Sequence, residues 1–200
     1  MPAKVVEYYY DFSSTNSYFA TFLTPEVCRR TGAELRWLPF YLVHAFRHNN
    51  HSLDKEPRAK LAYFWRDHQR WAKRTGLPFR MPSIFPIKSS QALRGAIVMQ
   101  QWGKEQAYIQ EVFRAYWERD ENIAAPAVLG QIAVGLGVDA NAFLRESQGE
   151  AARQEVIRIT DEGIKRGVFG APTFFVGDEM FWGKDRLDFV EELLRKSDEH

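Results

Sequence analysis

The amino-acid sequence predicts an α/β fold in which a small sheet is divided by a large, wholly helical insertion. Strand-like apolar segments occupy residues 5–10 and 34–39, and comparable segments return only at residues 172–182. Between them, from about residue 44 to residue 165, the spacing of apolar residues is helical almost throughout. With 200 residues, of which 45% are hydrophobic, the chain is long enough for one domain that carries a large insertion.

The N-terminal segment has the pattern of a strand, a helix and a second strand. The first strand is expected over residues 5–10, the helix over 17–30, and the second strand over 34–39 after the stop signal Thr31-Gly32. Two strands joined by a helix run parallel in one sheet. The turn after residue 10 is therefore expected at the carboxyl end of the first strand, where α/β sheets bind ligands.

The middle of the chain is predicted to be an array of helices. A helix over residues 61–72 carries apolar side chains at three-to-four spacing, namely Leu61, Phe64, Trp65, His68, Trp71 and Ala72. We expect this face, with its histidine and tryptophans, to pack on a core rather than around a cofactor. Three prolines predict an ordered loop over 78–86. Further helices are expected over residues 92–101, 105–118, 125–135, 140–148 and 151–166.

The C-terminal segment returns to strands and closes on a helix. Residues 172–176 and 179–182 flank a Gly177-Asp178 turn, which is a hairpin signal, and a last helix is expected over 186–196. The resulting order is the one that a thioredoxin-type sheet with inserted helices would have. We therefore expect residues 1–43 and 166–200 to form a discontinuous thioredoxin-like domain, and residues 44–165 to form a helical insertion domain.

Charge and composition exclude several classes of partner. The net charge is +1, from 27 basic and 26 acidic side chains, so we expect no nucleic-acid partner, and the arginine-rich stretch 66–74 is interpreted as a solvated helix face. The apolar runs are too short to cross a bilayer, so no membrane partner is expected. Residues 1–4 lead directly into a strand and show no signal-peptide pattern, which predicts a cytoplasmic protein. A small molecule is the expected partner.

The single cysteine limits redox and metal chemistry. With Cys28 alone, the chain can form neither an intramolecular disulfide nor a dithiol redox centre, and it cannot build a zinc site from four cysteines. Cys28 lies in the helical pattern of residues 17–30, and we expect it to be a small buried hydrophobic residue. No metal site is predicted.

The polar turn Ser14-Thr15-Asn16-Ser17 is the candidate centre of the chemistry, with Ser14 as the candidate catalytic residue. A helix N-terminus presents unpaired N–H groups and the positive end of the helix dipole, which together stabilise an anion such as a thiolate. The alternative is structural, because serine is a favoured N-cap.

Pro172 opens an otherwise apolar strand, in Gly170-Ala171-Pro172-Thr173. A proline at the first residue of a strand lacks the N–H that the sheet would pair. The Ala171–Pro172 bond could be trans, as most bonds before proline are, or cis. A cis bond could expose the N–H and C=O groups of Ala171 to a peptide lying alongside in an extended conformation.

The chain resembles the 2-hydroxychromene-2-carboxylate isomerases and the kappa-class glutathione transferases, a branch of the thioredoxin-like, DsbA-type fold. The matching segments span nearly the whole chain, and they are residues 10–18, 69–72, 76–78, 167–176 and 181–187. In DsbA-like oxidoreductases the turn reads Cys-x-x-Cys, whereas here both cysteine positions hold serine, Ser14 and Ser17. The resemblance therefore implies that a sulfur atom must be brought in by a cofactor.

That cofactor, as the resemblance implies, is glutathione. A free thiol titrates at about 8.5, and a hydrogen bond from Ser14 together with the helix dipole would raise its thiolate fraction at neutral pH. By the same resemblance the glutathione backbone pairs with Ala171 beside Pro172, Asn49 lines the same cleft, and the γ-glutamyl end is held by Trp182, Gly183, Lys184 and Asp185. Asp185 suits an ammonium group, although it could also cap the last helix.

The activity that the resemblance implies is glutathione-dependent isomerisation. The thiolate would add to the ring of an aromatic-derived carboxylate, the ring would open and rotate, and elimination would return glutathione unchanged. One alternative is a kappa-class-like transferase that conjugates small electrophiles, and a second is a non-enzymatic thioredoxin-like binding protein. The family also implies a homodimer and a place in aromatic catabolism.

Departures from the family pattern leave the substrate open. The residue after the catalytic serine is usually proline and here is Thr15. Where the family often has a lysine that could anchor a substrate carboxylate, His44 and Arg47 are the nearby candidates. Lys88 stands where the family commonly has asparagine, and it could either meet an anionic substrate or be a solvated surface lysine.

Overall fold

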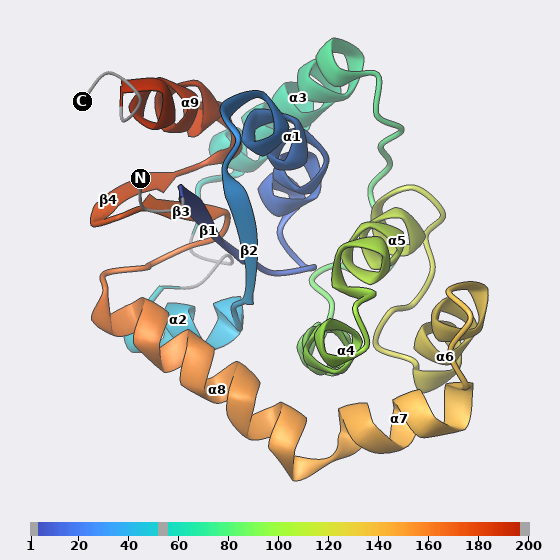
Figure 1. The fold of residues 1–200 in the computed structure, drawn as a ribbon. Coiled ribbons are helices and arrows are strands. Elements are labelled where there is room, and N and C mark those ends of the chain that lie inside the picture. Colours follow the sequence, from blue (N-terminus) through green and yellow to red (C-terminus); the bar gives the residue numbers. More distant parts are fainter. Residues whose placement is uncertain (1–3, 52–55, 197–200) are drawn as a thin grey trace.

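A four-stranded mixed sheet forms the centre of the thioredoxin-like part of the molecule (Figure 1). The computed structural model describes residues 4–51 and 56–196. The strands β1 (Val5–Tyr10), β2 (Glu34–Pro39), β3 (Thr173–Val176) and β4 (Glu179–Trp182) lie in the order β2-β1-β3-β4. β1 and β2 are parallel, and β3 is antiparallel to both β1 and β4. The predicted α/β class, the parallel pair and the C-terminal hairpin are confirmed.

Helices cover both faces of this sheet, and a group of helices extends beyond its edge (Figure 1). α1 and α9 lie on one side of the sheet, and α2 and α8 lie on the other. The helices are α1 (Thr15–Thr31), α2 (Leu42–His48), α3 (Arg58–Thr75), α4 (Ser90–Gln101), α5 (Glu105–Trp117), α6 (Pro126–Gly135), α7 (Ala140–Gln148), α8 (Glu150–Lys165), the short 3₁₀ turn η2 (Lys184–Arg186) and α9 (Leu187–Lys196).

Aromatic side chains of β1 fill the core on both faces of the sheet. Successive residues of a strand point to opposite faces. Tyr8 stacks on Phe174 of β3 with ring centroids 4.9 Å apart, while Tyr9, on the opposite face, meets Phe175 edge-on at 5.9 Å. Both tyrosines are buried, as is expected for a central strand covered by helices on each side.

The insertion is joined to the end of β1 by aromatic packing and one buried hydrogen bond. Phe12, just after β1, lies 4.8 Å from Phe113 of α5, measured between ring centroids. The indole Nε1 of Trp117 donates to the Phe12 carbonyl at 2.9 Å. The segment that leads into the Ser14 turn is therefore held by the helical insertion.

Several element boundaries differ from the predicted ones, and three of them lie next to the candidate site. α1 begins at Thr15 rather than Ser17, because the Ser14 side chain accepts the Ser17 N–H and so caps the helix earlier. β3 begins at Thr173, one residue after the proline, since Pro172 has no N–H to pair in the sheet. The last helix begins at Leu187, preceded by the 3₁₀ turn η2 instead of a cap at residue 185.

The face of α3 that was expected to be buried is exposed over its first half. Leu61, Phe64 and Trp65 are 44%, 38% and 39% exposed, and no residue of the described helix is buried. The helix packs on the body of the molecule through Trp65 against Phe79, and through His68 and Trp71 against Phe19 of α1. The prediction of core packing is wrong for Leu61 and Phe64, because periodicity identifies an apolar face but not what covers it.

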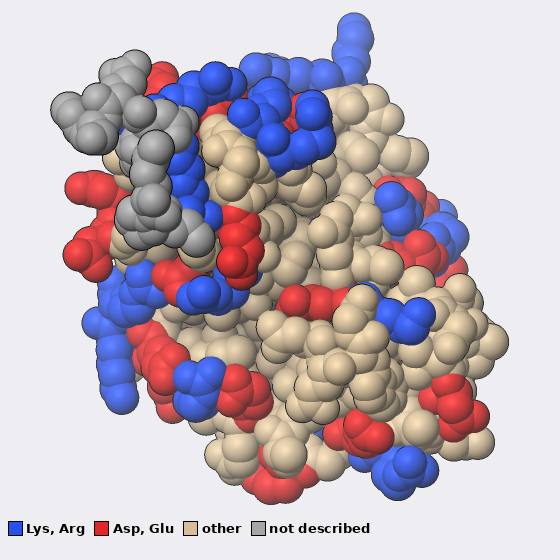
Figure 2. Space-filling view, in the orientation of Figure 1, with Lys and Arg blue, Asp and Glu red and all other residues tan. Residues whose placement is uncertain are grey.

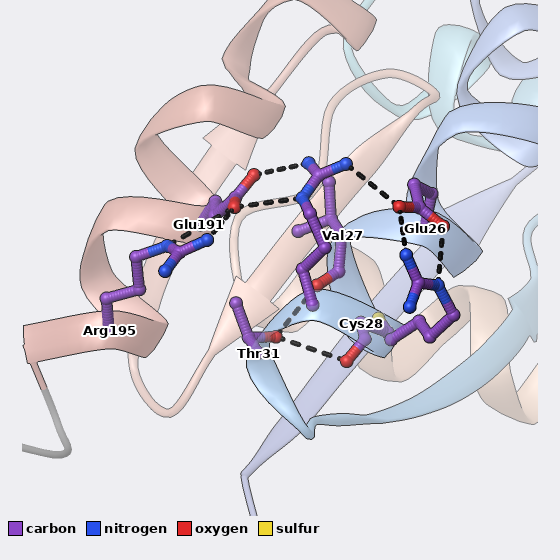
Figure 3. Close-up of polar contacts among 8 residues, drawn as sticks. Glu26, Val27, Cys28, Thr31, Glu191 and Arg195 are labelled. Atoms are coloured by element: carbon purple, nitrogen blue, oxygen red, sulfur yellow. Dashed lines mark hydrogen bonds and ion pairs between the residues drawn. The ribbon is translucent and has the colours of Figure 1, made fainter.

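Salt bridges tie the C-terminal end of α1 to α9 (Figure 3). Arg30 lies between Glu26 of its own helix, at 3.3 Å, and Glu191 of α9, at 2.5 Å. Arg30 and then Arg195 lower the pKa of Glu191 to about 2. Figure 3 also shows Thr31, whose hydroxyl donates to the carbonyl of Val27 at 2.9 Å. The end of α1 opposite the Ser14 turn is thus anchored.

Other sequence-based expectations can be compared with the described residues. Cys28 is buried, and burial raises the pKa of its thiol to about 11, as expected for an unreactive core cysteine. No helix in the described part of the chain is long and apolar enough to cross a membrane. On the face drawn in Figure 2, basic and acidic side chains are intermixed, and neither sign forms a continuous patch over the middle of the face.

Candidate active site

Ser14 lies at the junction of β1 and α1, at the positive end of the helix dipole. Its backbone is extended, with φ −92° and ψ 116°, and its Oγ accepts the Ser17 N–H at 3.2 Å. The same Oγ donates to the Ala171 carbonyl at 2.8 Å. The N-cap alternative is therefore confirmed, but it uses only a lone pair of the oxygen. The hydroxyl proton points across to the loop before β3.

The loop before β3 brings distant residues to Ser14. The Ala171–Pro172 peptide bond is cis. The Pro172 carbonyl accepts the Gly183 N–H at 3.0 Å, which ties the end of β4 to the same loop. The Ala171 N–H donates to no residue in the described part of the chain. The structure thus brings Ser14, Ala171, Pro172 and Gly183 together.

Two further polar atoms at the start of α1 are buried and unpaired. Among the described residues, neither Asn16 Oδ1 nor Ser17 Oγ has a hydrogen-bond partner. Buried polar atoms are nearly always paired, so an unpaired one needs an explanation. Both atoms are closed off from solvent, so in this conformation they are not open to a bound molecule.

Asp11 supports the turn from behind, and sequence reasoning assigned it no role. This carboxylate is completely buried. It accepts from the N–H and the hydroxyl of Ser13, both at 2.8 Å, and from the Leu42 N–H at 2.9 Å. Burial raises the pKa of Asp11, and these hydrogen bonds oppose the rise. A charged residue directly after an apolar strand was the signal that could have identified it.

Trp182 forms an open wall of the site. It is 50% exposed and packs on Phe169 with ring centroids 5.0 Å apart. A Cβ at Gly170 would lie 2.7 Å from Trp182 Nε1, so only glycine allows the indole to lie there. The tryptophan is therefore held beside Ala171 while keeping one face open.

Asp185 lies inside the turn η2, so the alternative prediction that it caps a helix from residue 186 is wrong. Its side chain is exposed and lies 3.4 Å from Arg186. Gly183, with φ 112°, makes room for it, since a Cβ there would lie 2.6 Å from Asp185 Oδ1. The carboxylate is accessible to a cationic group.

Lys184, between these two residues, is turned the other way. It is only 7% exposed, with Nζ 3.6 Å from Asp67 Oδ2 and 4.5 Å from the centroid of the Trp71 ring. Burial lowers the pKa of Lys184, and the carboxylates of Asp67 and Asp185 oppose this effect. His68, next to Asp67, has its pKa lowered to about 4 by burial and by Lys184, so it is neutral at pH 7.

The remaining predicted residues either have partners away from the Ser14 turn or are exposed. Asn49 caps the C-terminus of α2, where its Nδ2 donates to the Ala45 carbonyl at 3.0 Å. His44 is exposed and lies 3.3 Å from Asp161 of α8. Arg47 and Lys88 are exposed. None of these four side chains hydrogen-bonds or pairs with the Ser14 turn.

Comparison with known proteins identifies relatives over nearly the full length. A family model described as "DSBA-like thioredoxin domain" matches residues 5–195. A 2-hydroxychromene-2-carboxylate isomerase of Sphingobium xenophagum is 30% identical over 96% of this chain and 98% of its own length. The enzyme of the same name from Pseudomonas putida is 32% identical over 95% of this chain and 94% of its own length.

A solved structure and a second class of relative extend this comparison. The structure of a 2-hydroxychromene-2-carboxylate isomerase superposes with a TM-score of 0.86 at 29% identity, and covers 96% of this chain and 95% of that one. "Glutathione s-transferase kappa 2" of Caenorhabditis elegans is 24% identical over 96% of this chain and 92% of its own length.

Proposed function

Because the chain belongs to the DSBA-like thioredoxin domain family, and to the 2-hydroxychromene-2-carboxylate isomerase family within it, we propose that it is a glutathione-dependent isomerase. The observation that carries the proposal is the position of Ser14 Oγ, at the N-terminus of α1 and 2.8 Å from the Ala171 carbonyl. A hydroxyl donor at a helix N-terminus suits a thiolate. The two serines in dithiol spacing leave no sulfur in the turn itself.

The residues around Ser14 fit a bound glutathione. The free Ala171 N–H and the carbonyl beside it match the donor and acceptor of a peptide lying in an extended conformation. If a ligand N–H takes over the Ala171 carbonyl, the Ser14 hydroxyl is released to donate to sulfur.

The segment Trp182–Asp185 is proposed to hold the γ-glutamyl end. The exposed Asp185 carboxylate suits an ammonium group, and Gly183 is tied to Pro172 by its N–H. Asn49 is proposed to line the same cleft. For the substrate carboxylate we propose the exposed cations His44, Arg47 and Lys88.

When bound, glutathione supplies a sulfur nucleophile that adds reversibly to an aromatic-derived carboxylate and leaves unchanged after cis–trans isomerisation. Ser14 is proposed to stabilise the thiolate, not to attack carbon itself. The helix N-terminus contributes fixed dipoles, which need no reorganisation during the reaction. The domain boundaries at residues 43/44 and 165/166, the cytoplasmic location and the homodimeric state stay predictions.

A titration of the ultraviolet absorbance of glutathione thiolate tests the proposal. The wild-type protein is expected to lower the thiol pKa of bound glutathione, and Ser14→Ala to return it toward about 8.5. Thr31→Ser and Thr31→Ala are the controls, because the Thr31 hydroxyl donates to the Val27 carbonyl at the opposite end of α1. If wild type binds glutathione without a change in thiol pKa, the protein is a binding module and the catalytic role of Ser14 is wrong.

Product analysis separates the isomerase from a kappa-class transferase, which the relative in Caenorhabditis elegans makes the second candidate. The isomerase is expected to convert a hydroxychromene carboxylate with no loss of glutathione. A transferase would consume one glutathione for each molecule of chlorodinitrobenzene.

A further inference from the structure

Lys184 is buried in a segment whose neighbours are exposed. Trp182 is 50% exposed and Asp185 is exposed, whereas Lys184 is 7% exposed. Lysine is rarely this buried without a partner. Its partners both lie on α3, where Asp67 Oδ2 is 3.6 Å away and the Trp71 ring centroid 4.5 Å away. The ammonium group is therefore directed at the helical insertion.

Helix α3 has few other attachments to the molecule. None of its described residues is buried. Its ring contacts outside the helix are with Phe79 and with Phe19, the latter through His68 and Trp71 at 6.3 and 6.4 Å. The Trp71 ring shields the ion pair between Lys184 and Asp67 from solvent. Because α3 has no buried face, this ion pair contributes a larger part of the energy that holds the helix in place than it would for a buried helix.

The contact of Lys184 links both walls of the candidate site through α3. On one side, Lys184 follows Gly183, whose N–H donates to the Pro172 carbonyl. On the other side, Trp71 packs on Phe19, which lies in α1 shortly after its cap, Ser14. A displacement of α3 would therefore change its contacts with segment 182–185 and with α1 at the same time.

We propose that Lys184 is a positioning residue, whose contacts with Asp67 and Trp71 fix helix α3 against segment 182–185 and thereby set the geometry for glutathione. The part of this inference that concerns glutathione rests on the proposed function. Lys184 acts through α3 and does not bind glutathione through its ammonium group, which is already paired. Sequence reasoning placed the lysine among direct ligands because its neighbours are candidates for that role.

Hydrogen exchange of the ligand-free protein tests the contact without glutathione. Lys184→Met and Asp67→Ala are each expected to speed amide exchange about tenfold, in both residues 62–75 and residues 181–186. Lys184→Arg is expected to restore most of the protection. Arg70→Met is the matched control. It removes a cation of the same helix, whose Nη1 lies 4.0 Å from Asp67 Oδ1, and leaves the contact between Asp67 and Lys184 in place. Unchanged exchange in segment 181–186 of Asp67→Ala would overturn the proposal.

Glutathione affinity tests the consequence for the site. Asp67→Ala and Lys184→Met are each expected to raise the Kd for glutathione by the same factor, on the order of tenfold, and the double variant to be no weaker than either single one. Weak binding by Lys184→Met alone would show that lysine touches the ligand and would refute the positioning role. If wild type does not bind glutathione at all, the proposed function fails, while hydrogen exchange still decides the role of Lys184.

Discussion

Replacing Asp11 by asparagine removes one hydrogen-bond acceptor from the buried support of the Ser14 turn. In the wild-type protein one carboxylate oxygen accepts from the Ser13 N–H and hydroxyl, and the other accepts from the Leu42 N–H at 2.9 Å. Asparagine has nearly the same shape, but it has one oxygen and one NH₂ group. If the oxygen keeps the Ser13 contacts, the NH₂ group faces the Leu42 N–H, donor against donor.

The expected loss of stability follows from that single mismatch. A buried donor left without a partner costs about 1–3 kcal/mol. Part of this cost is offset, because Asp11→Asn also removes a buried charge, and burial raises the pKa of Asp11 by disfavouring that charge. We therefore expect the free energy of unfolding to fall by about 1–2 kcal/mol at pH 7.

The pH dependence gives this prediction a second readout. The pKa of Asp11 is raised on folding, so its contribution to stability is fully present below its ordinary value of 3.8 and is lost as pH rises through the folded-state pKa. Asn cannot titrate. The deficit of Asp11→Asn relative to wild type is therefore expected to be larger at pH 4 than at pH 7.

Urea unfolding followed by tryptophan fluorescence at pH 4, 5.5 and 7 measures both effects. Asp178→Asn is the control, because Asp178 is exposed in the hairpin turn and its replacement should change the free energy of unfolding by less than about 0.5 kcal/mol. Equal stability of Asp11→Asn and wild type, or a difference that does not change with pH, would refute the role given to this carboxylate.

Two further substitutions test particular contacts. Burial raises the pKa of Glu105 from 4.5 to about 7, and Glu105 Oε1 has no partner in the described part of the chain. The contribution of the protonated Glu105 side chain to the free energy of unfolding is therefore lost as pH rises from 4.5 to 7. At about 1.4 kcal/mol per pKa unit, Glu105→Gln should be up to about 3 kcal/mol more stable than wild type at pH 8 and equal to it near pH 4, as measured by urea unfolding. Gly170→Ala places a Cβ 2.7 Å from Trp182 Nε1, so the indole must move. The free energy of unfolding should fall by about 1–3 kcal/mol, and glutathione should bind more weakly. Tryptophan emission and glutathione affinity identical to those of wild type would contradict the contact.

Much of the fold could be predicted because local patterns and topology agree. Residues 5–10, 34–39 and 179–182 are strands as predicted, and the hairpin signal at Gly177-Asp178 identified the pairing of β3 with β4. The parallel pairing of β1 with β2 followed from the rule that a strand–helix–strand unit is parallel. The positions of Ser14 and Ala171 could be related only through the family resemblance, since 157 residues separate them.

What could not be predicted depends on contacts between distant segments. The apolar stripe of α3 was visible in the sequence, but whether Phe64 meets a core depends on where the helix is placed. Lys184 looked like a ligand because its neighbours are candidates, and only its contact with Asp67 showed that it faces the insertion. Asp11 lay in a matching segment, yet its hydrogen bond to Leu42 crosses two elements and leaves no local pattern.

The two interpretations of Ser14, helix cap and thiolate donor, are compatible because they use different parts of one oxygen. A cap accepts through a lone pair, here from the Ser17 N–H, and does not use the proton. The proton donates to the Ala171 carbonyl, and under the proposal it turns to sulfur when a ligand N–H takes over that carbonyl. A cysteine at this position would itself ionise and take up the positive field of α1. Serine stays neutral at pH 7, so the field remains for an anion that arrives from outside. Since Arg30 and Glu191 anchor the far end of α1, that field has a fixed direction toward the position proposed for the thiolate.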